Sequence, residues 1–169
     1  MPAARISPAT RERGFTLTEI VVTLLVIGIV AAIALPRMGN DPILVSTQAD
    51  QLAGDIRYVQ TLAMTKGQRY IISFPSATSY RILDSAGSPV VHPSNGSNAA
   101  VTLASGVTLA LASTPAGNAL GFDGLGTPYS VTTPATFNGP LTAPATITLT
   151  RDAASRTSTV TPQTGKVTP

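Results

Sequence analysis

Residues 13–36 read RGFTLTEIVVTLLVIGIVAAIALP. Within this stretch, the run from Phe15 to Leu35 has 21 residues, and Glu19 is the only charged one. At about 1.5 Å per residue, a helix of that length spans roughly 30 Å, which is the thickness of the hydrocarbon core of a bilayer. We therefore predict a single membrane-spanning helix in this part of the chain.

Three arginines precede the apolar run: Arg5, Arg11 and Arg13. Because Lys and Arg beside a membrane helix stay on the cytoplasmic side, we predict a cytoplasmic N-terminus, with the residues after about 37 outside. A secretory signal peptide has a shorter apolar region followed by a cleavage site of small residues. The run here is longer and has no such site after it, so an uncleaved signal anchor is one open interpretation.

Glu19 lies close to the start of the apolar run. A carboxylate inside a membrane costs a few kcal/mol unless it is paired, so it indicates a functional site with a specific partner. A free α-amino group four residues upstream would be such a partner. That amine exists only if the chain is cut before Phe15.

The order Arg13-Gly14-Phe15, then Glu19, the apolar run and Pro36 resembles the class III signal of type IV prepilins and type II secretion pseudopilins. The resemblance implies that a prepilin peptidase cuts after Gly14 on the cytoplasmic side and N-methylates Phe15. It also implies that Glu19 is the glutamate at the fifth position of the mature chain, and that Pro36 is the proline common at its twenty-second position.

The resemblance implies a role for Glu19 in assembly. Its carboxylate would pair with the terminal ammonium of Phe15, in the same or a neighbouring subunit, when the helices leave the lipid and pack into a filament core. The alternative is a carboxylate that only reaches to the membrane interface.

A second helix follows the membrane segment. Pro36 predicts a kink or break, Asp41-Pro42 a helix start, and Lys66-Gly67 a helix end. Apolar residues recur at steps of four and three: Val45, Ala49, Leu52, Ile56, Val59 and Ala63. The polar face holds Gln48, Asp50, Gln51, Asp55, Arg57 and Gln60. This pattern predicts an amphipathic helix packed on a sheet of its own head, or alternatively a groove for a partner helix.

After Gly67 the hydrophobic period changes to two, which indicates strands. We predict a hairpin of 69–74 and 79–83, a loop at 85–98, and further strands at 101–103, 106–112, 120–122, 129–132, 145–150 and 157–161. The predicted fold is α+β and pilin-like, with a long N-terminal helix that continues into an amphipathic helix packed on an antiparallel β-sheet head. We expect four parts: a cleaved leader at 1–14, a transmembrane and assembly helix at 15–36, an amphipathic helix at 37–67 and a periplasmic β-rich head at 68–169.

The composition offers little for catalysis or metal binding. The chain has no Cys and a single His, His92, which falls in the predicted 85–98 loop and is expected to be solvated. The aspartates are scattered singly, and no nucleophile elbow of the G-x-S-x-G kind occurs. The glycines at 121–126 lack the Lys-Ser/Thr of a phosphate loop and predict a turn between strands. We expect no enzyme activity, no cofactor and no metal.

Nucleic-acid capture is a second possible function. Arg151, Arg156 and Lys166 near the C-terminus could converge on one face, and binding through them would weaken steeply with salt. However, residues 15–169 hold eight Lys and Arg against seven Asp and Glu, a net charge of only +1. A solvated strand edge is therefore the favoured interpretation of these three cations.

The head itself resembles the minor pseudopilins of the GspH/FimT and MSHA types. The residues that carry the likeness are 55–60, 67–69, 122–128 and 164–167, although the Cys pair of major type IV pilins and an acidic cluster like the calcium site of major pseudopilins are missing. The resemblance implies a minor pilin-like subunit in the bacterial inner membrane, either for secretion or for a pilus. Its implied partners are the prepilin peptidase, other pilin or pseudopilin subunits, the inner-membrane assembly platform and membrane lipid, with 85–98 and 112–119 as the expected subunit contacts.

Overall fold

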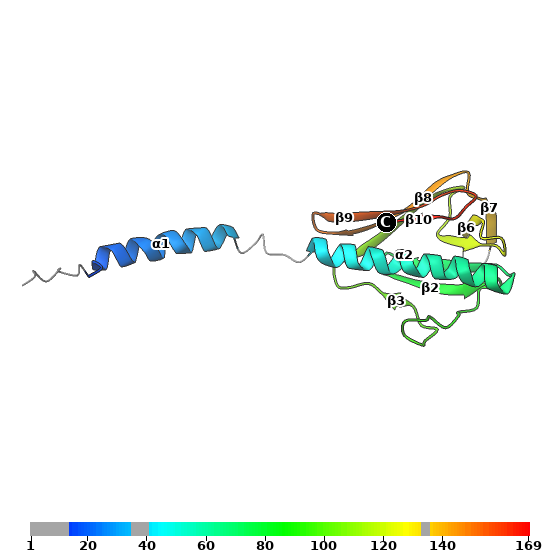
Figure 1. Ribbon diagram of the computed structural model, residues 1–169, viewed down its shortest axis with the longest axis horizontal. Coiled ribbons are helices and arrows are strands. Elements are labelled where there is room, and N and C mark those ends of the chain that lie inside the picture. Colours follow the sequence, from blue (N-terminus) through cyan, green and yellow to red (C-terminus); the bar gives the residue numbers. More distant parts are fainter. Residues whose placement is uncertain (1–13, 35–40, 133–135) are drawn as a thin grey trace, which may run out of the picture. The chain divides into compact units, whose positions relative to one another are not determined.

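The computed structural model describes residues 14–34, 41–132 and 136–169. The chain forms two compact units, residues 1–39 and 40–169 (Figure 1). The predicted leader before Gly14, its arginines and the predicted kink at Pro36 lie outside the described residues.

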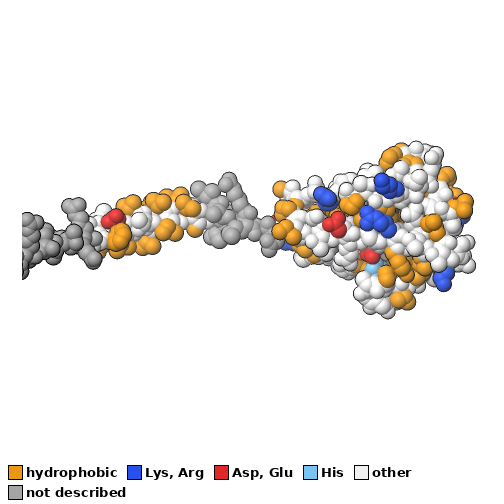
Figure 2. Space-filling model, in the orientation of Figure 1, with side chains coloured by type: hydrophobic (Ala, Val, Ile, Leu, Met, Phe, Trp, Pro, Cys, Tyr) orange, Lys and Arg blue, Asp and Glu red, His pale blue; other side chains and the backbone are white. Residues whose placement is uncertain are grey.

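The described residues of the first unit, 14–34, form one helix, α1, which comprises Leu17–Ala34. Its large apolar side chains from Ile20 to Val30 are all at least half exposed, and they lie on every side of this part of the helix. Figure 2 shows these apolar side chains along the helix. Within the described part of the chain, none of the helices combines the length and the apolar character needed to cross a membrane.

The second unit packs one helix, α2 (Asp41–Lys66), against two antiparallel sheets. Figure 1 shows α2 lying over the strands, roughly along the direction of β2 and β9. The strands are β1 Tyr70–Ser76, β2 Ser79–Asp84, β3 Val101–Thr102, β4 Thr108–Thr114, β5 Ala119–Phe122, β6 Pro128–Thr132, β7 Thr136–Pro140, β8 Ala143–Arg151, β9 Ala154–Val160 and β10 Val167–Thr168. The larger sheet has the order β3-β2-β1-β5-β6-β7, and the smaller has the order β10-β9-β8-β4.

The apolar stripe of α2 faces the main core, as predicted. All six stripe residues named from the sequence are at most 1% exposed. They pack with inward-facing residues of both sheets, among them Ile72, Leu120 and Ile147. The interpretation of the stripe as a groove for a partner helix is therefore wrong, because the chain's own sheets occupy it.

The helix ends as predicted. Gly67 has a φ of 62°, a left-handed conformation in which glycine carries no Cβ penalty. The next residue, Gln68, donates its N–H to the carbonyl of Ala63, which satisfies one of the last carbonyls of the helix.

Each predicted strand overlaps an observed strand, but two observed strands were not predicted. β7 and β10 were not predicted, because β7 holds Gly139 and Pro140 and β10 has only two residues. β1 continues through Pro75, beyond its predicted end at residue 74, and the register with β2 shifts at this point. β4 extends to Thr114 and β5 begins at Ala119, so only the middle of the loop expected at 112–119 is loop.

Candidate functional site

The predicted processing site lies at the start of the first unit. Phe15 is 79% exposed, and Glu19 lies in the first turn of α1. Gly14, Phe15, Thr16 and Glu19 line an open hollow. Glu19 makes no ion pair within the described residues, so its carboxylate is available to an amine.

Thr16 has a role that the sequence analysis missed. Its Oγ1 accepts the backbone N–H of Glu19 at 3.2 Å, which makes Thr16 the N-cap of α1 and Glu19 the third helical residue. The spacing Thr-x-x-Glu is the sequence signal of this arrangement. Glu19 also places negative charge where the helix dipole favours it, so it has a local structural role beside the predicted pairing.

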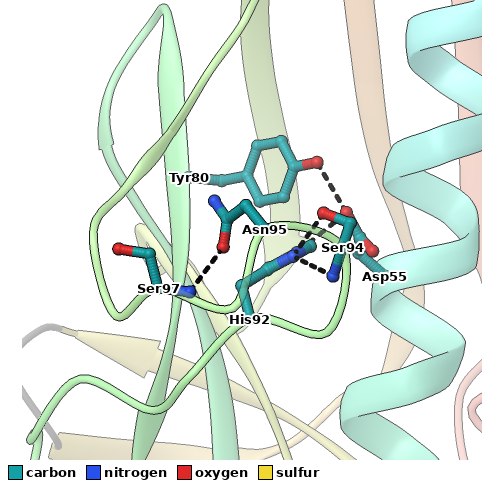
Figure 3. A network of polar contacts seen from close by, with 6 residues as sticks. All are labelled: Asp55, Tyr80, His92, Ser94, Asn95 and Ser97. Atoms are coloured by element: carbon teal, nitrogen blue, oxygen red, sulfur yellow. Dashed lines mark hydrogen bonds and ion pairs between the residues drawn. The ribbon is translucent and has the colours of Figure 1, made fainter.

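In the head, a buried polar network joins α2, β2 and the 85–98 loop (Figure 3). Asp55 on α2 is 8% exposed, and Tyr80 on β2 and His92 in the loop are each 1% exposed. The Tyr80 hydroxyl donates to Asp55 Oδ2 at 2.6 Å, and His92 Nε2 lies 3.1 Å from the same oxygen. Two elements and the loop therefore meet at one carboxylate oxygen.

The hydrogen bonds of His92 define its tautomer. Ser94 donates its backbone N–H to His92 Nδ1 at 3.3 Å, and its hydroxyl lies 2.8 Å from the same nitrogen. Because an N–H can only donate, Nδ1 is an acceptor and the neutral ring carries its proton on Nε2, facing Asp55. This N–H is not aligned as a hydrogen bond, so the contact with Asp55 is mainly electrostatic.

The prediction that His92 is solvated was wrong. The loop folds back on itself, since the His92 N–H donates to Ser97 O at 2.7 Å and the Gly96 N–H donates to His92 O at 2.9 Å. The assignment of Asp55 to the polar face of α2 was also wrong. Asp55 follows Leu52 by three positions and precedes Val59 by four, which is the spacing of the buried stripe. A carboxylate at that spacing was the available signal for a buried partner.

The network is suited to holding the loop rather than to catalysis. Burial, the hydrogen bond to Asp55 and the charge of Asp55 all raise the pKa of Tyr80 well above its usual range. A phenol in this state stays protonated and serves as a hydrogen-bond donor. Asp55 uses one oxygen for both contacts. The Ser94 hydroxyl lies 2.8 Å from His92 Nδ1, but the same nitrogen accepts the Ser94 backbone N–H and the ring is buried, so these contacts belong to the fold of the loop.

A second set of contacts fixes the C-terminal tail on α2. Arg57 donates to Val167 O at 3.0 Å. Gln60 Nε2 donates to Gly126 O at 3.0 Å and to Thr164 O at 2.9 Å. The polar face of the helix therefore clamps the turn before β6 and the turn before β10.

The three cations considered for nucleic acid are not gathered into one site. Arg151 at the end of β8 pairs with Asp41 at 2.9 Å. Arg156 lies opposite Leu149 near one end of β9, whereas Lys166 leads into β10, which pairs with the other end of β9. Among the described residues, no group of three metal-ligating side chains forms either.

Two family models match this chain and identify its family. Residues 9–35 match the prokaryotic N-terminal methylation motif, and residues 48–165 match the family described as type II transport protein GspH. The chain belongs to the GspH family. It is a minor pilin or pseudopilin of type II secretion or of a type IV pilus, which is a structural subunit and not an enzyme. Membership implies assembly with other pilin subunits.

Solved structures similar to this GspH-family chain come from two bacteria. One is the type IV minor pilin FimU of Pseudomonas aeruginosa, with 14% identity, a TM-score of 0.49, and coverage of 73% of this chain and 86% of that one. The other is the minor pseudopilin EpsH from the type 2 secretion system of Vibrio cholerae, with 13% identity, a TM-score of 0.49, and coverage of 73% and 94%. No curated protein sequence matches the chain significantly.

Proposed function

We propose that this chain inserts into the bacterial inner membrane as a single-pass precursor and is cut by prepilin peptidase between Gly14 and Phe15. The new N-terminus is methylated, and the mature subunit joins a short periplasmic filament. The observation that carries the proposal is the methylation motif at residues 9–35, with Glu19 at the start of an apolar helix. The head at 40–169 lies on the periplasmic side.

The first unit supports burial in an apolar environment. A helix that is hydrophobic on every side is stable only inside lipid or inside a core of other helices. The exposed residues of α1 have this character, and the first unit is a compact unit separate from the head. We therefore assign residues 15–36 first to the membrane, where the lipid is a partner, and then to the core of the filament.

Glu19 selects the neighbour during assembly. Once the chain is cut, the α-amino group of Phe15 lies four residues before Glu19, beside the open hollow that both residues line. A charged pair in an apolar environment is favoured only when both charges are present and close. The ion pair therefore stabilises a register in which the α-amino group of each cut chain lies beside a Glu19 carboxylate. The assembly platform adds subunits in that register.

The test is the mass of the N-terminal peptide from protein extracted from its native membrane. A chain that starts at N-methylated Phe15 is the expected result. A chain that still carries residues 1–14 would instead identify a signal-anchored periplasmic domain, and the filament assignment would be withdrawn.

The machine that the subunit serves is tested in a strain that lacks this chain. A subunit of a secretion pseudopilus is required for export of folded proteins, whereas a minor pilin is required for surface pili. Loss of secretion with intact pili would assign the chain to type II secretion, which is the description of its family. Loss of pili with normal secretion would assign it to a type IV pilus.

A further inference from the structure

The larger sheet has a second face that α2 does not cover. Along β1, residues alternate between the main core and this outer face, so Ile72 packs with α2 while Ile71 belongs to a separate apolar cluster. The buried members of the outer cluster are Ile71, Leu83, Ala119 and Val131, with Tyr129 and Phe137 packed against them. The outer face thus has an apolar centre capped by two half-buried aromatic rings.

Arg69 lies over these two rings. Its guanidinium carbon is 4.7 Å from the centre of Phe137 and 5.3 Å from the centre of Tyr129, and the rings meet edge to face at 5.8 Å. Stacking occupies the flat side of a guanidinium and leaves its N–H edge free to donate. Arg69 is exposed and has no hydrogen bond or ion pair within the described residues. Its guanidinium N–H groups are therefore held in place by the rings but have no acceptor there.

Arg81 is a second cation on the same face. It lies on β2 opposite Ser73, two positions from Leu83 of the outer cluster. Its Nε is buried without a hydrogen-bond partner. From the strand spacings, Arg69 and Arg81 are roughly 14 Å apart, with the apolar centre between them.

This face carries cations without matching acids. Of the acids closest in sequence to its strands, Asp84 accepts the N–H groups of Ala86 and Ser88. Asp123 accepts those of Leu125 and Thr127. Neither acid is paired with Arg69 or Arg81.

We propose that this outer face, defined by Arg69, Arg81, Tyr129 and Phe137, binds an acidic segment of a different subunit of the same filament. The proposal rests on the proposed function for the presence of that subunit. Arg and aromatic side chains at a partly buried centre are the residues that dominate protein interfaces, and a carboxylate is the planar acceptor that fits the free guanidinium edge. Nucleic acid is not favoured, because two cations separated by apolar surface neutralise few phosphates.

The test places a reactive amine at the site. In Arg69→Lys, a carbodiimide activates any carboxylate in contact, and Nζ then forms an amide with the carboxyl carbon while the carbodiimide leaves as a urea that keeps the oxygen. The full chain is treated in its native membrane, and cross-linked peptides are assigned by mass. We expect a new cross-link from position 69 to an Asp or Glu of another pilin-like protein, absent from the wild type because arginine does not react.

Arg156→Lys is the matched control, since Arg156 is also an exposed arginine but lies on β9 of the smaller sheet. The proposal is overturned by equal cross-linking at 69 and 156, by a link only to a second copy or to Asp123 of the same chain, or by no link at all. Samples are first checked for a chain that starts at Phe15. A processed chain without a cross-link contradicts only this proposal, whereas an unprocessed chain contradicts the proposed function.

Arg69→Gln gives an independent readout. The variant keeps a polar side chain over the rings but removes the charge, so the head should remain folded. We expect co-purification of the partner identified by cross-linking to fall about tenfold or more, the size typical of an interface hot spot. Unchanged co-purification would show that Arg69 only covers the aromatic rings of its own sheet.

Discussion

His92 Nε2 lies 3.1 Å from Asp55 Oδ2, and this contact fixes the 85–98 loop on the central helix of the head. The Tyr80 hydroxyl reaches the same oxygen from β2. A buried carboxylate is stable only when donors surround it. The loop is therefore part of the head's folded core at this point, although its flanking residues, such as Val91, are exposed.

We predict that His92→Ala destabilises the head and loosens the loop. The variant removes a fully buried side chain and its electrostatic contact with Asp55, so the free energy of unfolding should fall by about 2–3 kcal/mol. Urea unfolding of the full chain in detergent measures the loss, and amide hydrogen exchange should rise in residues 85–98. Val91→Ala, next in the chain but 56% exposed, should change stability by no more than about 0.5 kcal/mol. Equal effects of the two variants would show that the His92 contacts do not fix the loop.

We predict a dependence on alkaline pH that comes from Tyr80. Its pKa is raised in the folded state, so its stabilising contribution is complete below the unfolded pKa of about 10 and is lost as the pH rises above that value. The chain has four tyrosines. In a titration followed by phenolate absorbance, one should ionise only at much higher pH, together with unfolding.

Tyr80→Phe is the check on that assignment. The late ionisation should disappear, and the variant should lose about 1–3 kcal/mol at neutral pH because Asp55 loses a donor. Persistence of the late step in Tyr80→Phe would place it on another tyrosine and remove the assignment.

We predict that Gly165→Ala is among the most damaging single-methyl changes in the head. Gly165 has a φ of 63°, and an added Cβ would lie 2.4 Å from Gln60 Nε2 and 2.8 Å from the carbonyl oxygen of Gly126. The tail would have to leave α2, at a cost of about 2 kcal/mol or more. Gly96→Ala is the control, because its φ is 62° but nothing lies within 4 Å of the added Cβ. The difference in unfolding free energy between the variants measures the packing alone, and equal losses would show that backbone strain explains both.

The elements that could be predicted from the sequence are those with local signals. The steps of three and four from Val45 to Ala63 identify α2 and its buried face, because a helix repeats every 3.6 residues. Gly67 identifies its end, and the alternation in 69–83 identifies the β1–β2 hairpin. The site residues Gly14, Phe15 and Glu19 could be proposed because the methylation motif is a short contiguous pattern.

The features that could not be predicted depend on contacts between distant residues. Nothing local to His92 shows that Asp55 and Tyr80 will meet it, since the contact requires the loop to fold against α2. The separation of the strands into two sheets likewise follows from which edges pair, and alternation alone does not encode strand order. β7 was missed because Gly139 and Pro140 are typical of turns, yet it lies at the edge of its sheet, where fewer backbone donors are needed.

Binding of DNA by the head should be weak and independent of Arg151. Because Arg151 is paired with Asp41 at 2.9 Å, Arg151→Ala should leave any affinity for duplex DNA unchanged. It should lower the free energy of unfolding by no more than about 1 kcal/mol, the usual range for a partly exposed ion pair. Affinity measured at several salt concentrations should show a shallow slope, since few phosphates are neutralised. A steep slope that is abolished by Arg156→Ala would contradict this expectation and revive the nucleic-acid function.

Glu19 offers the sharpest test of assembly. Glu19→Ala should still insert into the membrane, because insertion depends on the apolar run, but the chain should fail to enter filaments, because assembly depends on the pair with the Phe15 amine. The effect of Glu19 on the helix cap must be distinguished from the effect of its charge, since Glu19 also occupies the third position of a helix capped by Thr16. Glu19→Gln does this, because glutamine supports the same capping arrangement without a negative charge. If the ion pair drives assembly, both variants fractionate with membranes, are cut after Gly14 and are absent from sheared filaments. If Glu19→Gln assembles like the wild type while Glu19→Ala does not, the residue acts through the helix cap, and the pairing with Phe15 is wrong.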